Sequence, residues 1–329
     1  MIHSQNKLNL LIALTLGVFL GIVLGCLYGL QRSKEMANCA YTRQFIHHDI
    51  DCAGTDTLFK TISETQQLLI EQITRRKSAG DAERVSVFYR DLTTNRWFGI
   101  DEDAPFRPGS LLKLPLAIAY YKLSEVDPSI LEHRLVFTSS GTSLNMAQHE
   151  KPDNLLNSGN EYSPHELIVR MIEESDNDPV PLLTGALMTG YLDKVYLDLG
   201  VHFPTTEGIE KDFVSVRTYA SILRSLYYST YLDPDNSEEI LSLMSKSRFV
   251  NGIKSGLPAS VPYANKFGER EYTDEVTRKT EFQLHDCGIV YADKSPYVLC
   301  VMTEGADYEK LKGVIADISK TTYERQGSQ

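Results

Sequence analysis

The chain is poor in several residue types that mark particular kinds of protein. It has 1 tryptophan and 5 cysteines in 329 residues, and no Cys-x-x-Cys or His-x-x-x-His spacing. Because zinc sites use such spacings, the sequence predicts neither a metal site nor a cofactor. Asp and Glu (44) outnumber Lys and Arg (33), and the net charge of −11 argues against nucleic-acid binding.

Internal repeats and low-complexity tracts are also absent. With 42% hydrophobic and 23% charged residues, the composition is that of an ordinary globular protein. The length is sufficient to bury a sizeable core, in one large domain or two small ones.

One long hydrophobic run stands near the N-terminus. Residues 8–30 carry no ionisable group apart from one cysteine and one tyrosine, and a helix over them is roughly 34 Å long, enough to cross a bilayer. We expect 1–7 to be a short cytoplasmic stub, 8–30 a transmembrane signal anchor and 31–55 a stalk. The domain at 56–329 would then lie on the extracytoplasmic side of the cell membrane.

Two other interpretations of this run stay open. A cleaved signal peptide would be shorter and would end in a clear small-x-small cleavage site. A lipoprotein signal would use Cys26, but the leucine before Gly25 fits that motif poorly and the apolar run continues past the cysteine. The anchor is the favoured interpretation.

The other cysteines fall into two pairs. An exported domain can form disulfides, and Cys39 with Cys52 would close a small loop in the stalk. Cys287 and Cys300 lie on predicted strands, where we expect them to be small buried hydrophobic side chains.

Hydrophobic periodicity predicts strands at both ends of the 56–329 domain and helices between them. Strands are expected over 84–92, 96–100, 261–266, 284–292 and 296–303, and helices over 56–77, 114–121, 164–173, 216–228 and around 311–318. The simplest assembly is an α+β fold with one antiparallel sheet built from N- and C-terminal strands and flanked by helices. An all-helical subdomain at about 124–254 is inserted, and a site at the seam would draw residues from both parts.

The first candidate for chemistry lies in residues 107–115, where a Pro-Gly turn leads into an apolar helix. Ser110 and Lys113 are neighbours on the first turn of that helix. A serine hydroxyl needs a base within hydrogen-bond reach, and burial among apolar side chains would lower the pKa of Lys113 enough to make it one. The Ser-x-x-Lys spacing alone is a weak signal, because residues 4–7 repeat it in a polar stretch.

Two further motifs follow in order along the chain. Ser-Asp-Asn stands at 175–177, where a capped helix ends, and Lys-Phe-Gly stands at 266–268 on a late strand. With Ser-x-x-Lys, this series resembles the motif trio of class A β-lactamases and penicillin-binding proteins. The segments at 162–177 and 253–266 resemble the family as well, so the resemblance covers roughly 57–323.

A literal Lys-Ser-Gly occurs earlier, at 254–256. It lies in a connector, whereas the family's lysine lies on the strand that lines the pocket. We therefore assign the third motif to 266–268 and expect Lys254 to be a solvated surface residue.

The resemblance implies a role for each matching residue. Ser110 is the nucleophile, Lys113 is its base, and Ser175 relays a proton to the leaving nitrogen. Asn177 bonds both Lys113 and the substrate amide. Lys266 supplies positive charge near the relay serine and the substrate carboxylate.

The resemblance also implies an oxyanion hole, made by the backbone N–H groups of Ser110 and Glu269. Each N–H donor of this kind stabilises the transition state by about 3 kcal/mol. Gly268 is assigned to the same substrate-binding strand, and Asp176 is expected to be structural.

One departure from the family pattern affects substrate binding. Position 267 is Phe where the family has Thr or Ser, whose hydroxyl helps to hold the substrate carboxylate. Arg270 or Arg278 could compensate, unless both belong to a charged loop at 269–281.

A second departure affects turnover. The family hydrolyses its acyl-enzyme with a water held by a Glu-x-x-x-Asn pair after Ser-Asp-Asn. Residues 178–217 contain no asparagine, and Glu207 and Glu210 are the glutamates there. Without that pair, deacylation would lag behind acylation.

The resulting prediction is a membrane-anchored, exported, monomeric serine hydrolase that opens β-lactams through a Ser110 acyl-enzyme. The first alternative is a penicillin-binding D-alanyl-D-alanine peptidase that acts on cell-wall peptides. The second is a catalytically idle wall-binding module. Such a module would not need all five polar residues of the motifs, and the sequence retains Ser110, Lys113, Ser175, Asn177 and Lys266. The expected partners are a small-molecule substrate and, through 8–30, a membrane.

Overall fold

The computed structural model describes residues 55–139, 141–204, 212–273 and 278–327, together with 17, 21–25 and 28. The chain divides into two units, Met1–Lys60 and Thr61–Gln329. The described residues at 17, 21–25 and 28 are helical.

The predicted stub at 1–7, the Cys39–Cys52 disulfide and most of the predicted anchor and stalk lie outside the described residues. Across the described ranges, no helix combines the length and the apolar character that a membrane span requires.

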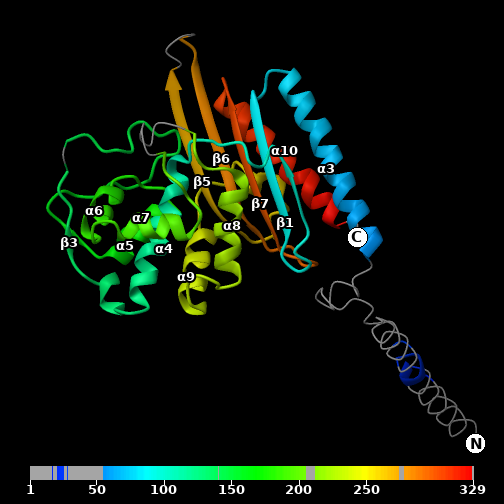
Figure 1. Ribbon diagram of the computed structural model, residues 1–329, viewed down its shortest axis with the longest axis horizontal. Coiled ribbons are helices and arrows are strands. Elements are labelled where there is room, and N and C mark those ends of the chain that lie inside the picture. The colour runs from blue at the N-terminus through cyan, green and yellow to red at the C-terminus, as the bar shows by residue number, and fades with distance from the viewer. Residues whose placement is uncertain are drawn as a thin grey trace, which may run out of the picture. The chain divides into compact units, whose positions relative to one another are not determined.

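A five-stranded antiparallel sheet forms the centre of the second unit (Figure 1). Its strands are β1 (Arg84–Asp91), β2 (Trp97–Ile100), β5 (Tyr263–Thr273), β6 (Thr280–Val290) and β7 (Tyr297–Gly305), in the order β2-β1-β7-β6-β5. The N-terminal strand β1 pairs with the C-terminal strand β7, so the prediction of a sheet built from both ends is confirmed. Strand β5 is left at an edge of the sheet.

Two helices from opposite ends of the sequence cover one face of the sheet. They are α3 (Thr55–Ser78) and α10 (Tyr308–Gly327), which run along the same face in Figure 1. The apolar stripe predicted around 311–318 is buried there, against strand residues such as Val87 and Val301.

The helices from the middle of the chain form a second core. They are α4 (Lys113–Ser124), α5 (Pro164–Glu173), α6 (Pro179–Ala186), α7 (Tyr191–Asp198), α8 (Val216–Tyr227) and α9 (Pro234–Ser245). Helices α8 and α9 pack against the sheet. Helix α4 is apolar on all sides and lies in the centre of this second core, as expected for a helix surrounded by others. The capping box is present: Ser163 Oγ accepts from Glu166 N (3.1 Å), and Glu166 accepts from Ser163 N (2.6 Å).

Shorter elements complete the fold. They are the strand pair β3 (Leu135–Val136) and β4 (Glu161–Tyr162) and the 3-10 turns η1 (Gly109–Leu112), η2 (Pro128–Leu131) and η4 (Ile253–Gly256). The strand pair lies within 124–254, so the prediction that this subdomain is all-helical is wrong at this point. Turn η1 leads directly into α4.

The prediction of a charged loop at 269–281 is wrong over most of its length. Strand β5 continues to Thr273 and β6 begins at Thr280, and these two residues are partners in the register. Strand pairing depends on backbone hydrogen bonds, so a hairpin can extend through polar residues that carry no hydrophobic alternation.

The interpretation of Cys287 and Cys300 as simple hydrophobic side chains is also corrected. Both are fully buried, as expected, but they are direct partners across β6 and β7 and form a disulfide. Their separation along the sequence gives no sign of this pairing, which follows from the strand register.

Candidate active site

The turn that carries Ser110 lies against strand β5. Gly109 has a φ of 50°, and a Cβ on this residue would come 2.8 Å from the carbonyl oxygen of Glu269. A Cβ on Gly268 would come 2.5 Å from the carbonyl oxygen of Pro108. Glycine is therefore required on both sides for the turn and the edge strand to approach each other.

The hydroxyl of Ser175 lies between two lysines. Lys113 Nζ donates to Ser175 Oγ (3.2 Å) and to the Ser175 carbonyl oxygen. Lys266 Nζ donates to the same Oγ (2.8 Å) and to the carbonyl oxygen of Phe267 (3.0 Å). The fold thus joins one residue from each of the three sequence motifs through a single hydroxyl group.

Burial lowers the pKa of both lysines. It lowers the pKa of Lys113 well below the usual value, and the neighbouring charge of Lys266 lowers it further. Burial also lowers the pKa of Lys266 to about 7, against the opposing effects of Asp286 and Glu269. A neutral Lys113 amine can accept the proton of Ser110, which lines the same cavity.

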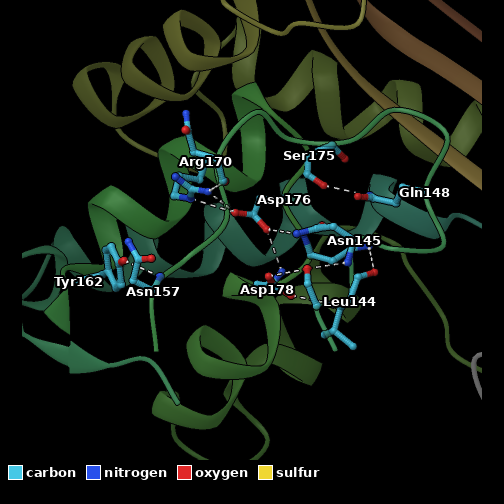
Figure 2. A network of polar contacts seen from close by, with 12 residues as sticks. Leu144, Asn145, Gln148, Asn157, Tyr162, Arg170, Ser175, Asp176 and Asp178 are labelled. Atoms are coloured by element: carbon cyan, nitrogen blue, oxygen red, sulfur yellow. Dashed lines mark hydrogen bonds and ion pairs between the residues drawn. The ribbon is translucent and has the colours of Figure 1, made fainter. Parts of the chain in front are cut away.

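Asp176 holds the Ser-Asp-Asn turn together (Figure 2). Its fully buried carboxylate accepts from Asn145 Nδ2 (2.7 Å), from Asp178 N (3.0 Å) and from the Arg170 guanidinium (2.9 Å). Asn145 Oδ1 in turn accepts from Asn177 N (2.7 Å). These contacts fix the backbone that presents Ser175 and Asn177.

Asn177 does not make the contact with Lys113 that the resemblance implies. Its Nδ2 donates to the carbonyl oxygen of Leu144 (3.1 Å), and the Lys113 amine is directed to Ser175 instead. Asn177 nevertheless lines the same cavity as Ser110 and Lys113. It can therefore still reach a bound substrate.

The third motif lies in the middle of β5 rather than at a strand end. Phe267 is buried in the core beneath α10, where it stacks on Phe249 at 4.3 Å between ring centroids. It does not line the cavity beside Ser110, so the hydroxyl of the family's Thr or Ser has no counterpart at this position. Lys254, predicted to be solvated, is half-buried on η4 and donates to two backbone carbonyl groups, away from the site.

The side chain of Glu269 connects the edge strand to the loop at 143–150. Its carboxylate accepts from His149 N (3.0 Å), Glu150 N (3.2 Å) and the hydroxyl of Tyr308 (2.5 Å). Burial raises the pKa of this carboxyl group. At the other side of the loop, Gln148 Nε2 donates to the Ser175 carbonyl oxygen (3.1 Å).

Sequence reasoning missed Asn145, Gln148 and His149. They stand in a polar stretch without a motif, and their contacts arise only because the fold brings this loop to the Ser-Asp-Asn turn. The two glutamates considered for deacylation, Glu207 and Glu210, lie outside the described residues.

A cavity of about 650 Å³ lies beside the nucleophile. Ser110, Lys113 and Asn177 are in its wall, whereas Ser175 and Lys266 are not. Among the residues with described positions, no group of His, Cys, Asp and Glu side chains is arranged to hold a metal ion.

Known proteins share this fold. Residues 68–326 match the family described as the β-lactamase enzyme family. A single-residue mutant of PBP-A, solved as an acyl-enzyme complex with penicillin G, superposes with a TM-score of 0.67 and 18% identity over 82% of this chain and 98% of that one. No curated protein sequence matches.

Two β-lactamase structures superpose on this chain with similar TM-scores and identities. One from Xanthomonas campestris pv. campestris gives a TM-score of 0.67 and 18% identity, over 80% of this chain and 99% of that one. A class A β-lactamase from Mycobacterium abscessus gives 0.65 and 20%, over 78% and 98%. Such identities support the fold alone.

A serine hydrolase fold of the β-lactamase and penicillin-binding type thus carries the Ser110, Ser175 and Lys266 motifs in one site. The family match spans most of the sequence, and the chain belongs to the β-lactamase enzyme family.

Proposed function

We propose that this protein opens the amide bond of β-lactams through an acyl-enzyme on Ser110. The observation that carries the proposal is the Ser175 hydroxyl held between Lys113 and Lys266, beside the cavity that Ser110 lines. A proton acceptor and a proton relay are thereby in contact before substrate arrives, as acyl transfer to a serine requires.

Acylation would proceed by a balanced transfer of one proton. Ser110 Oγ attacks the lactam carbonyl carbon while the neutral amine of Lys113 takes the hydroxyl proton. The carbon–nitrogen bond of the ring then breaks, Ser175 delivers its proton to the ring nitrogen, and the proton on Lys113 replaces it. The backbone N–H groups of Ser110 and Glu269 would hold the negative oxygen between these steps.

We propose further that deacylation is slow. Among the described residues that line the cavity, the one carboxylate is Asp193, which is solvent-exposed on α7. The Glu-x-x-x-Asn pair that positions water in the family has no counterpart at residues 178–217, the segment that follows Ser-Asp-Asn. This favours, as the second candidate, a penicillin-binding peptidase that acts on D-alanyl-D-alanine ends of cell-wall peptides.

A fluorescent penicillin tests both candidates on the full chain. Covalent labelling is followed first, and then the loss of label after a chase with unlabelled drug, with Ser110→Ala as the control. Label that depends on Ser110 and persists for hours supports the penicillin-binding type, and label lost within seconds supports an efficient β-lactamase. A complete absence of Ser110-dependent label would contradict both and favour an idle module.

We also propose that residues 8–30 anchor the protein in the cell membrane as a monomer, with the catalytic domain outside. The support is the apolar composition of that run. Cell fractionation followed by protease treatment of intact cells should find the chain in the membrane fraction and degrade its domain. Recovery in the soluble fraction would contradict the anchor.

A further inference from the structure

The described side chains that line the cavity beside Ser110 are predominantly apolar. Leu112 comes from η1, Leu116 from α4, Val180 from α6, and Leu192 and Tyr196 from α7. Phe203 adds an aromatic ring that meets Tyr196 edge-on, at 4.7 Å between centroids. The volume of the cavity, about 650 Å³, lies within the range of pockets that bind a small-molecule ligand.

Two polar groups of the site lie outside the cavity. Ser175 and Lys266, which would protonate the leaving nitrogen and attract a carboxylate, are absent from the cavity wall. Ser110 and Lys113 belong to both regions, because they line the cavity and Lys113 contacts Ser175. The leaving group is thus accommodated on the Ser175 side, and the substituent of the acyl group is left for the cavity.

We propose that this cavity binds a long aliphatic or aromatic substituent of the acyl group that becomes attached to Ser110. The inference rests on the proposed function and names its substrate class: acyl donors with an extended, uncharged, apolar side chain. Burial of each methylene against the leucines and aromatic rings stabilises the bound substrate and the transition state. A carboxylate at the end of the chain would share the cavity with Asp193, whose negative charge disfavours it.

A homologous series of 6-acylaminopenicillanic acids tests the proposal on the full chain. The acyl groups are acetyl, butanoyl, hexanoyl and octanoyl, and the second-order rate of Ser110 acylation is followed by intact-protein mass spectrometry. The rate should rise about fourfold per methylene until the cavity is filled. An octanedioyl analogue, which ends in a carboxylate, should lose most of the advantage of the octanoyl compound.

Two tryptophan substitutions on α6 separate the cavity from general hydrophobicity. Thr184 is solvent-exposed and lines the cavity, whereas Ala186, on the same helix and also exposed, does not. Thr184→Trp should reduce the octanoyl-to-acetyl rate ratio at least tenfold, because the indole occupies the space of the chain. Ala186→Trp should keep the wild-type ratio.

The outcomes distinguish this inference from the proposed function. Acylation of Ser110 by the acetyl compound with a rise of less than 1.5-fold per methylene would overturn the inference and leave the function standing. Equal rate ratios in the two tryptophan variants would overturn it as well. Failure of every member of the series to acylate Ser110 would overturn the proposed function itself.

Discussion

The two walls of the site are built by different means. The wall around Ser175 and Lys266 is polar and buried, and hydrogen bonds join Ser175 to Lys266 and Asp176 to Asn145. The cavity wall on α6 and α7 presents mainly apolar side chains, with Thr184 and Asp193 among them. The first wall thus supplies the hydrogen-bonded groups for proton transfer, and the second supplies mainly apolar surface.

The largest effect should follow from removing the base of the polar wall. Lys113→Met should lower the rate of Ser110 acylation by about 10²–10⁴-fold, because the amine that takes the hydroxyl proton is lost. Stopped-flow measurement with a chromogenic penicillin gives the rate. Lys254→Met, which changes a half-buried lysine away from the site, is the matched control and should keep the wild-type rate. Similar losses in both variants would contradict the assignment.

The next effect concerns the carboxylate that holds the Ser-Asp-Asn turn. Asp176→Ala would leave Arg170 without its buried partner, and loss of such a partner costs about 3–5 kcal/mol of unfolding free energy. Urea denaturation measures this loss. Asp103→Ala, which removes an exposed partner of Arg217, should cost at most about 1 kcal/mol. If both variants lost the same amount, Asp176 would have no special structural role.

A pH profile can show that the two lysines of the polar wall act on each other. Burial is the main cause of the lowered pKa of Lys113, and the charge of Lys266 is the next. Lys266→Met removes that charge, so the pKa of Lys113 should rise toward its usual value. The acidic limb of acylation rate against pH should therefore move to higher pH. An unchanged limb, or one moved to lower pH, would show that Lys113 is not the titrating base.

The smallest effect concerns the contact between β5 and the loop at 143–150. Because burial raises the pKa of Glu269, the folded state holds its proton more tightly than the unfolded state does. The stability contributed by this group is present below the unfolded pKa and is lost as pH rises through the folded value. Glu269→Gln cannot ionise, so its stability relative to wild type should increase from pH 4 to pH 8. Thermal unfolding across that range measures the stability difference between the variant and wild type. A difference that does not change with pH would contradict the raised pKa of Glu269.

Much of the polar wall could be predicted from the sequence, because its residues stand in short motifs with fixed spacing. Ser110 and Lys113 are one helical turn apart, and the sequence order of the other two motifs identified Ser175 and Lys266. The strands at both ends were predicted for a similar reason, since period-two alternation is a local property. The capping box at Ser163 is equally local.

The remaining features depend on contacts between segments far apart in the sequence. The backbone N–H of His149 meets the carboxylate of Glu269, and Asn177 turns to Leu144 rather than to Lys113. The register that joins Cys287 to Cys300 is likewise set by whole strands. The cavity could not be predicted either, because no single segment contains its wall.

The close approach at Gly109 and Gly268 has a consequence for how such a site can change. Main-chain atoms meet there on both sides, so the spacing between the nucleophile and the edge strand is set by backbone geometry. Substitution at either glycine would displace the strand rather than adjust it. New substrate preferences are therefore more accessible through residues on α6 and α7, where a larger or smaller side chain alters only the space available.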